Sequence, residues 1–161
     1  MNEELICSKN PSQVLNLKAY FSCLIMIVVV IAIFVVGKDK FDLPPYFLAL
    51  LIFPLLTSIW RFMQIKCQKY ELTTERLRII SGVFNRNTEE IELYRIKDFS
   101  LKEPFLMRLF KLGDIFIESS DKSMPYIKIQ ALPGAADFKE HLRSCVEKIR
   151  DKKNVREVDF E

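Results

Sequence analysis

Two strongly apolar segments, separated by only six residues, dominate the first 60 positions of the chain. They are Ala19–Val36 and Leu43–Trp60, each 18 residues long and free of Asp, Glu, Lys, Arg and His. An α-helix of 18 residues is about 27 Å long, close to the hydrocarbon thickness of a bilayer. Because the connection is so short, the sequence predicts a transmembrane helical hairpin that returns the chain to the side where it began.

Lysine and arginine are unevenly placed around this helical hairpin. The short connection carries Lys38 and Lys40, whereas the flanks carry Lys9, Lys18, Arg61, Lys66, Lys69, Arg76 and Arg78. Cytoplasmic flanks of membrane helices are enriched in Lys and Arg, so we expect both termini in the cytoplasm. A cleaved signal peptide is the alternative for the first segment, but the segment is longer than a usual signal core and no small-x-small site follows it.

Prolines suggest where the two helices begin. We expect Asn10 to cap the first helix with Pro11 in its first turn, and Pro44–Pro45 to open the second. Pro54 falls inside the second apolar segment, where it is expected to kink the helix.

The remainder of the chain is long enough for one small globular domain. Residues 61–161 carry 20 Lys/Arg and 17 Asp/Glu, a mixture that argues against nucleic-acid binding. We expect a cytoplasmic leader and the interfacial start of the first helix at 1–18, the helical hairpin at 19–60 (helices 19–36 and 43–60), a cytoplasmic domain at 61–154 and a flexible tail at 155–161.

Within this domain the apolar pattern changes to a period of two, which is typical of half-buried strands. Strands are expected at 70–73, 76–81, 88–93, 95–103, 113–118 and 126–130, with a bulge near Asp98 and a short helical turn at 105–112. Residues 135–153 carry an apolar stripe at helical spacing, which consists of Phe138, Leu142, Cys145, Val146 and Ile149. The pattern predicts a small antiparallel sandwich or partly open barrel, capped by this C-terminal helix.

The order of these motifs is similar to that of a known family. The matching positions are Tyr70, Leu72, Thr73, Arg76, Leu77, Gly82, Ile91, Leu93, Ile96, Leu106, Arg108, Leu109, Leu112 and Gly113. Over about residues 67–130 the chain resembles the bacterial PH-like, membrane-flanked domain family, and the preceding helical hairpin suits that architecture. The resemblance implies a bent sheet sandwich capped by a helix, and it implies no reaction. Lys111 and Pro104 depart from the family's pattern.

Basic residues near the end of the helical hairpin are candidates for contact with anionic lipid. They are Arg61, Lys66, Lys69, Arg76, Arg78 and Arg86. We expect Arg76 to lie close to the membrane. The alternative for the strand arginines is a purely solvating or structural role, with Arg76 paired to a carboxylate such as Glu71 or Glu92.

A dense apolar cluster surrounds Arg108 in the segment 105–112. We expect most of its large side chains to be core or cap, and the remainder to contact a partner protein or interfacial lipid, because they cannot all face inward on one helical turn. The candidates for partner contact are Phe105, Leu106, Arg108 and Phe110.

Residues that carry chemistry form no catalytic or metal-binding pattern. Cys7, Cys23, Cys67 and Cys145 include no CxxC pair, and His141 is the only histidine. We expect free thiols, no metal, no cofactor and no enzymatic activity.

Together these observations predict an integral protein of a bacterial inner membrane. Its PH-like domain is expected to be an interaction or assembly module at the membrane surface, with a protein partner or a second copy of the chain. Binding of anionic lipid headgroups is the alternative, and membership of a transport complex is a third possibility.

Overall fold

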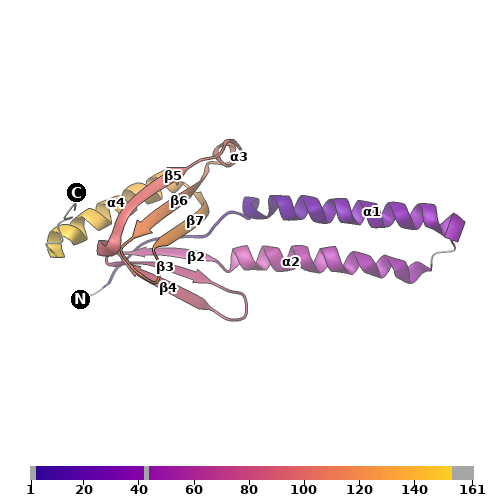
Figure 1. Ribbon diagram of the computed structural model, residues 1–161, viewed down its shortest axis with the longest axis horizontal. Helices are drawn as coiled ribbons and strands as arrows, with labels where there is room; N and C mark the ends of the chain where they lie inside the picture. The colour runs from indigo at the N-terminus through magenta and orange to yellow at the C-terminus, as the bar shows by residue number, and fades with distance from the viewer. Residues whose placement is uncertain (1–2, 42–43, 154–161) are drawn as a thin grey trace.

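The structure is a computed structural model that describes residues 3–41 and 44–153 (Figure 1). A mainly-β domain carries two long helices, which extend side by side from one end of it. Positions 42–43 of the connection and the expected tail at 155–161 lie outside the described residues.

The two long helices are antiparallel, as predicted, and each begins with a tighter 3₁₀ segment. In chain order the elements are η1 (Gln13–Asn16), α1 (Leu17–Phe41), η2 (Pro45–Leu51) and α2 (Ile52–Lys66). The predicted cap at Asn10 is wrong. Ser12 is the N-cap, because its backbone is extended and its hydroxyl oxygen accepts a hydrogen bond from the Val14 N–H at 3.3 Å.

Pro54 lies inside the second apolar helix, as predicted, and the winding of that helix changes close to it. The segment winds as a 3₁₀ helix up to Leu51 and as an α-helix from Ile52, so Pro54 is the third residue of α2. Because η2 runs directly into α2, carbonyl oxygens of η2 accept from the first N–H groups of α2, as those of Ala49 and Leu50 do from Ile52 N. Pro54 has no N–H and cannot continue this series. Pro44 and Pro45 open η2 as predicted.

Both helices are long and apolar enough to cross a membrane. The candidate spans are Gln13–Gly37 and Pro45–Lys66, with mean hydropathies of 3.0 and 1.7. Only 6% of each apolar window is buried. A helix in the core of a soluble protein buries at least one face, so these two helices are not core helices of the domain.

In the described part of the chain, seven strands form two antiparallel sheets. The first sheet has the order β1–β2–β3–β4 and consists of β1 (Leu5–Lys9), β2 (Lys69–Thr73), β3 (Arg76–Ser81) and β4 (Asn87–Glu92). The second has the order β5–β6–β7 and consists of β5 (Ile96–Lys102), β6 (Leu112–Ser119) and β7 (Tyr126–Pro133). A short turn, η3 (Leu93–Arg95), joins them, and the register of β5 shifts between Ile96 and Asp98, where a bulge was predicted.

Strand β1 is absent from the sequence prediction, which treats the first residues as a polar leader. It pairs with β2, with Lys9 opposite Tyr70 and Cys7 opposite Leu72. The strand is at the edge of the sheet and largely exposed, so it shows no buried face in its sequence. Since one strand precedes the helical hairpin and its partner follows it, the two ends of the hairpin meet in the same sheet.

The core lies between the two sheets and α4 (Ala135–Lys153), as predicted. Leu77, Ile91, Ile115, Ile117 and Ile129 are buried, and the α4 stripe of Phe138, Leu142, Cys145, Val146 and Ile149 is buried against them. In β3 the alternation slips, because Ile79 is half-buried and Ile80 is buried. The fold is therefore the predicted mainly-β sandwich capped by a C-terminal helix, with two sheets that are not closed into a barrel.

Candidate functional site

Side-chain amides at the start of the helical hairpin hydrogen-bond to backbone carbonyl oxygens at its end. Asn16 Nδ2 donates to the Arg61 carbonyl oxygen at 2.8 Å, and Gln13 Nε2 donates to the Phe62 carbonyl oxygen at 3.2 Å. Asn10 Nδ2 donates to the carbonyl oxygens of Lys66 and Gln68, at 3.4 and 3.0 Å. These amides precede α1 or lie in η1, and their acceptors lie in the last turns of α2 or just beyond it. We call this set of contacts the junction.

The junction is also tied to the second sheet. Ser12 N donates to the Ala131 carbonyl oxygen at 2.9 Å, and Lys9 Nζ donates to the carbonyl oxygens of Pro133 and Gly134 at 2.8 and 3.3 Å. The chain between β1 and α1 therefore contacts α2 on one side and the end of β7 on the other. This arrangement fixes the direction in which the helices leave the domain.

The strand cations proposed from the sequence are paired with carboxylates. Lys69 Nζ lies 2.7 Å from a Glu71 oxygen, and Arg76 lies 3.0 Å from Glu90. Arg78 bridges Glu3 at 2.9 Å and Glu90 at 3.0 Å. The hydrogen bond with Glu90, followed by the charge of Glu3, raises the pKa of Arg76.

Arg76 also lies at the far end of its strand from the helices, contrary to the sequence expectation. Ile80, at the other end of β3, pairs with Lys69, which follows α2 almost directly. Four residues of strand separate Ile80 from Arg76, which is about 13 Å. Arg76 and Arg78 therefore do not join the cations beside the helices, and the partner of Arg76 is Glu90 rather than the expected Glu71 or Glu92.

Three other predicted cations lie beside the helices. Arg61 and Lys66 are exposed on α2, and Arg86 is exposed in the β3–β4 loop. Within residues 3–41 and 44–153, no carboxylate forms an ion pair with any of them. Lys66 Nζ instead lies 5.7 Å from the centre of the Phe62 ring.

The β3–β4 loop places an aromatic ring against α2. The Phe84 and Trp60 ring centroids are 5.6 Å apart, yet 85% of the Phe84 side chain remains exposed. Gly82 makes this turn possible: its φ is +110°, and a Cβ there would lie 1.8 Å from the Asn85 carbonyl oxygen. No local sequence pattern indicates a function for Phe84, because its position next to Trp60 depends on the tertiary fold.

The apolar cluster around Arg108 is exposed, which contradicts the expectation that most of it is core or cap. It forms the short helix α3 (Phe105–Leu109), whose Phe105 is 82% exposed. Leu106, Leu109 and Phe110 are exposed as well, and Arg108 stands among them. The partner-contact candidates Phe105, Leu106, Arg108 and Phe110 therefore form one surface patch.

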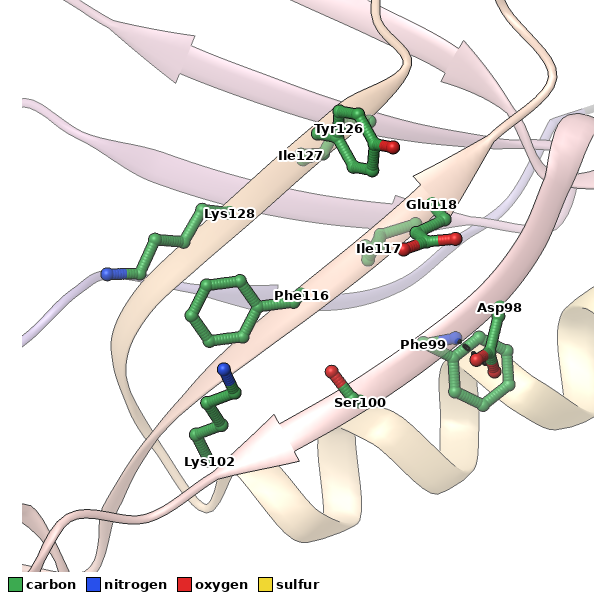
Figure 2. A pocket seen from close by; sticks show the side chains of 10 residues that line it. All are labelled: Asp98, Phe99, Ser100, Lys102, Phe116, Ile117, Glu118, Tyr126, Ile127 and Lys128. Carbon is green, nitrogen blue, oxygen red and sulfur yellow. Dashed lines mark hydrogen bonds between the residues drawn. The ribbon is translucent and has the colours of Figure 1, made fainter.

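A groove of about 400 Å³ lies on the outer face of the β5–β6–β7 sheet (Figure 2). Phe116 lies in it between the ammonium groups of Lys102 and Lys128, which are 4.7 and 5.2 Å from its ring centre. The opposite end carries Tyr126, which is 77% exposed, together with Asp98 and Glu118. We call this the aromatic groove. One residue could have indicated the groove from the sequence. Phe116 is an aromatic residue on the outward side of a strand, between the buried Ile115 and Ile117, and the predicted site did not include it.

A metal-binding site is the remaining kind of site to consider. Between residues 3 and 153, the gap at 42–43 apart, no group of three or more His, Cys, Asp or Glu side chains is arranged to hold a metal ion.

Comparisons with known proteins identify the fold. The family model described as "Bacterial PH domain" matches residues 13–145, which is most of the chain and includes the helical hairpin. A solved structure of a DUF1696 family protein with a pleckstrin-homology domain, from Shewanella loihica PV-4, is similar with 10% sequence identity and a TM-score of 0.43, covering 52% of this chain and 74% of that one. No curated protein matches the sequence. On the strength of the family match, this chain with two candidate membrane helices belongs to the bacterial PH domain family.

Proposed function

We propose that this protein is an integral protein of the bacterial inner membrane whose PH-like domain is a non-catalytic interaction or assembly module at the cytoplasmic surface. The junction is the observation that carries the proposal. Two exposed apolar helices leave the domain together. Asn10, Gln13 and Asn16 bond the start of the hairpin to its end, and Lys9 and Ser12 bond the same segment to the end of β7. A domain attached in this way presents fixed faces to whatever shares the membrane surface.

The aromatic groove is the surface that we assign to a protein partner. Aromatic side chains are enriched at protein interfaces, because they bury a large area and lose little conformational entropy. Phe116 and Tyr126 provide such area. Lys102 makes one end of the groove basic, where Lys128 is paired with Asp114 at 3.1 Å, and Asp98 and Glu118 make the other end acidic, which favours one orientation of a bound segment.

Photocrosslinking in native membranes tests this assignment. The full-length chain carries p-benzoylphenylalanine in place of Tyr126, and a matched variant carries it in place of Glu140, which is exposed on α4. The proposal expects a discrete protein adduct from position 126 that is absent from position 140. If neither position gives an adduct, or both give the same one, the groove is not the partner surface.

Integration into the membrane is tested separately by extraction. An integral helical hairpin keeps the chain in the membrane pellet after washing at alkaline pH, because its apolar helices are embedded in lipid. Release of the intact chain into the supernatant would refute the integral-membrane part of the proposal.

A second candidate function is recognition of anionic lipid, and the location of the cations favours it. Arg61, Lys66 and Arg86 are exposed at the domain end of the helices. There, each cation near the surface contributes about 1 kcal/mol to the free energy of attraction to an anionic leaflet. Replacing all three with Gln should lower the anionic lipid that co-purifies with the full chain, as measured by mass spectrometry. The matched pair Arg76→Gln with Arg78→Gln should leave it unchanged. An equal loss from the pair would contradict this division of the cations.

A further inference from the structure

Two exposed apolar tips of the domain lie level with the ends of the helical hairpin. One tip is α3 with the adjoining Phe110, and the other is the β3–β4 loop with Phe84. Along the long axis of the molecule both lie where α1 begins and α2 ends, on opposite sides of the hairpin in the view of Figure 1. Hydrogen bonds from Ser12 N to the Ala131 oxygen and from Gly134 N to the Lys111 oxygen connect the α3 side to the junction.

Each tip combines large apolar side chains with cations. Phe105, Leu106, Leu109 and Phe110 are exposed on the first tip, and Phe84 is exposed on the second. Arg108 and Lys111 accompany the first, and Arg86 accompanies the second. The segments 104–112 and 82–88 contain no Asp or Glu. Apolar side chains interspersed with Lys and Arg, without carboxylates, suit the boundary between acyl chains and anionic headgroups.

We propose that both tips insert into the cytoplasmic leaflet beside the helical hairpin, so that lipid covers Phe84 and the α3 patch. The inference rests on the proposed function, because it requires that the helices span the membrane. Lipid is the occupant that the geometry favours, since a membrane perpendicular to the helices meets both tips at the same time. A protein partner or a second copy would have to reach around the hairpin to cover both.

The proposed contact joins apolar side chains of the two tips to acyl chains, and it is distinct from a pocket that binds a lipid headgroup. Trp60 of α2 touches Phe84, so the apolar surface of the candidate span Pro45–Lys66 continues onto the domain without a polar break at that point. On the other side, the five residues of α3 pack chiefly on β6, which orients the exposed side chains without burying them. Insertion would hold the domain against the leaflet at two points in addition to the hairpin.

Tryptophan fluorescence provides the test, because Trp60 is the only tryptophan. The full chain is reconstituted in vesicles of phosphatidylethanolamine and phosphatidylglycerol that contain lipids brominated near the top of the acyl chains. Three variants in a Trp60→Phe background carry Phe84→Trp, Phe105→Trp or, as the control, Phe116→Trp in the aromatic groove. Far-UV circular dichroism and a thermal melt establish that each variant is folded.

The proposal expects quenching by brominated lipid of at least about twofold at positions 84 and 105, and little quenching at 116. Quenching at 84 and 105 no greater than at 116, with free access of aqueous iodide, would overturn it. Wild-type Trp60 separates the two proposals. If Trp60 is quenched by lipid while 84 and 105 are not, the hairpin is embedded and only the insertion of the tips is wrong. If Trp60 is not quenched either, the proposed membrane anchor fails as well.

Discussion

Replacing Asn16 with Ala tests the junction, because the side chain of Asn16 makes the most buried polar contacts of the junction. Asn16 is 5% exposed, and its Nδ2 lies 2.8 Å from the Arg61 oxygen, 3.2 Å from Gln13 Oε1 and 3.3 Å from the Tyr20 hydroxyl. An amide nitrogen carries two hydrogens, so the substitution removes two hydrogen bonds at most.

The expected loss is about 1–3 kcal/mol, from about 0.5–1.5 kcal/mol for each hydrogen bond. We expect a loss near the lower end of this range, because the hydrogen bond from Tyr20 OH to Gln13 Oε1, at 3.1 Å, survives the substitution. For a domain of roughly 100 residues, a loss of about 2 kcal/mol lowers the melting temperature by about 8–16 °C.

The assay is thermal unfolding of the full chain in lipid nanodiscs, followed by circular dichroism. The matched control is Asn87→Ala, which removes an exposed asparagine of β4 whose Nδ2 donates to Glu89 Oε1 at 3.3 Å. Asn16→Ala should lower the melting temperature clearly more than the control does. Equal melting temperatures for the two variants would refute the claim that the junction stabilises the chain by bonding the two helix ends together.

Three further substitutions or measurements test other parts of the structure. Gly82→Ala should destabilise the domain by about 1–3 kcal/mol in a urea melt, because the left-handed backbone and the contact with the Asn85 oxygen both oppose a Cβ; an unchanged urea midpoint would contradict this. Phe138→Ala should lower the free energy of unfolding by about 3–5 kcal/mol, since its ring is fully buried, whereas Glu140→Ala on the exposed face of α4 should change it little. Burial raises the pKa of the Cys145 thiol, so less thiolate forms at pH 8 and iodoacetamide should label this residue more slowly in the native chain than in the unfolded one; equal rates, read by mass spectrometry, would contradict the burial.

The strands and the C-terminal helix were predictable because their apolar periodicity is local. Ile115 and Ile117 alternate with outward residues in β6, and the stripe from Phe138 to Ile149 follows the helical period in α4. In both cases the buried face is visible within a single short segment, so no knowledge of distant contacts is needed.

Strand β1 and the junction could not be predicted in the same way. Cys7 pairs with Leu72 and Asn16 bonds to Arg61, so each contact joins residues on opposite sides of the helical hairpin. The edge strand has no alternating buried face, and an asparagine before a helix is most simply read as a cap. Only the folded sheet shows that these polar residues fasten the two helix ends together.

The candidate site was predicted only in part, because composition does not reveal which face a side chain occupies. The sequence grouped Arg76 with Arg61, yet the antiparallel run of β3 carries Arg76 away from the helices to Glu90. It expected most of the α3 cluster to be core, since exposed Phe and Leu are unfavourable in water, whereas Phe105 is exposed. That exposure is explained if lipid, rather than water, covers the patch.

Topology in intact cells tests the central claim most directly. One reporter is fused after Lys40, at the end of α1 that leads into the connection, and another after Glu161. The account predicts that the first reporter is active only outside the cytoplasm and the second only inside it. Both reporters on the same side, or the reverse arrangement, would contradict a helical hairpin that holds the PH-like domain against the cytoplasmic leaflet.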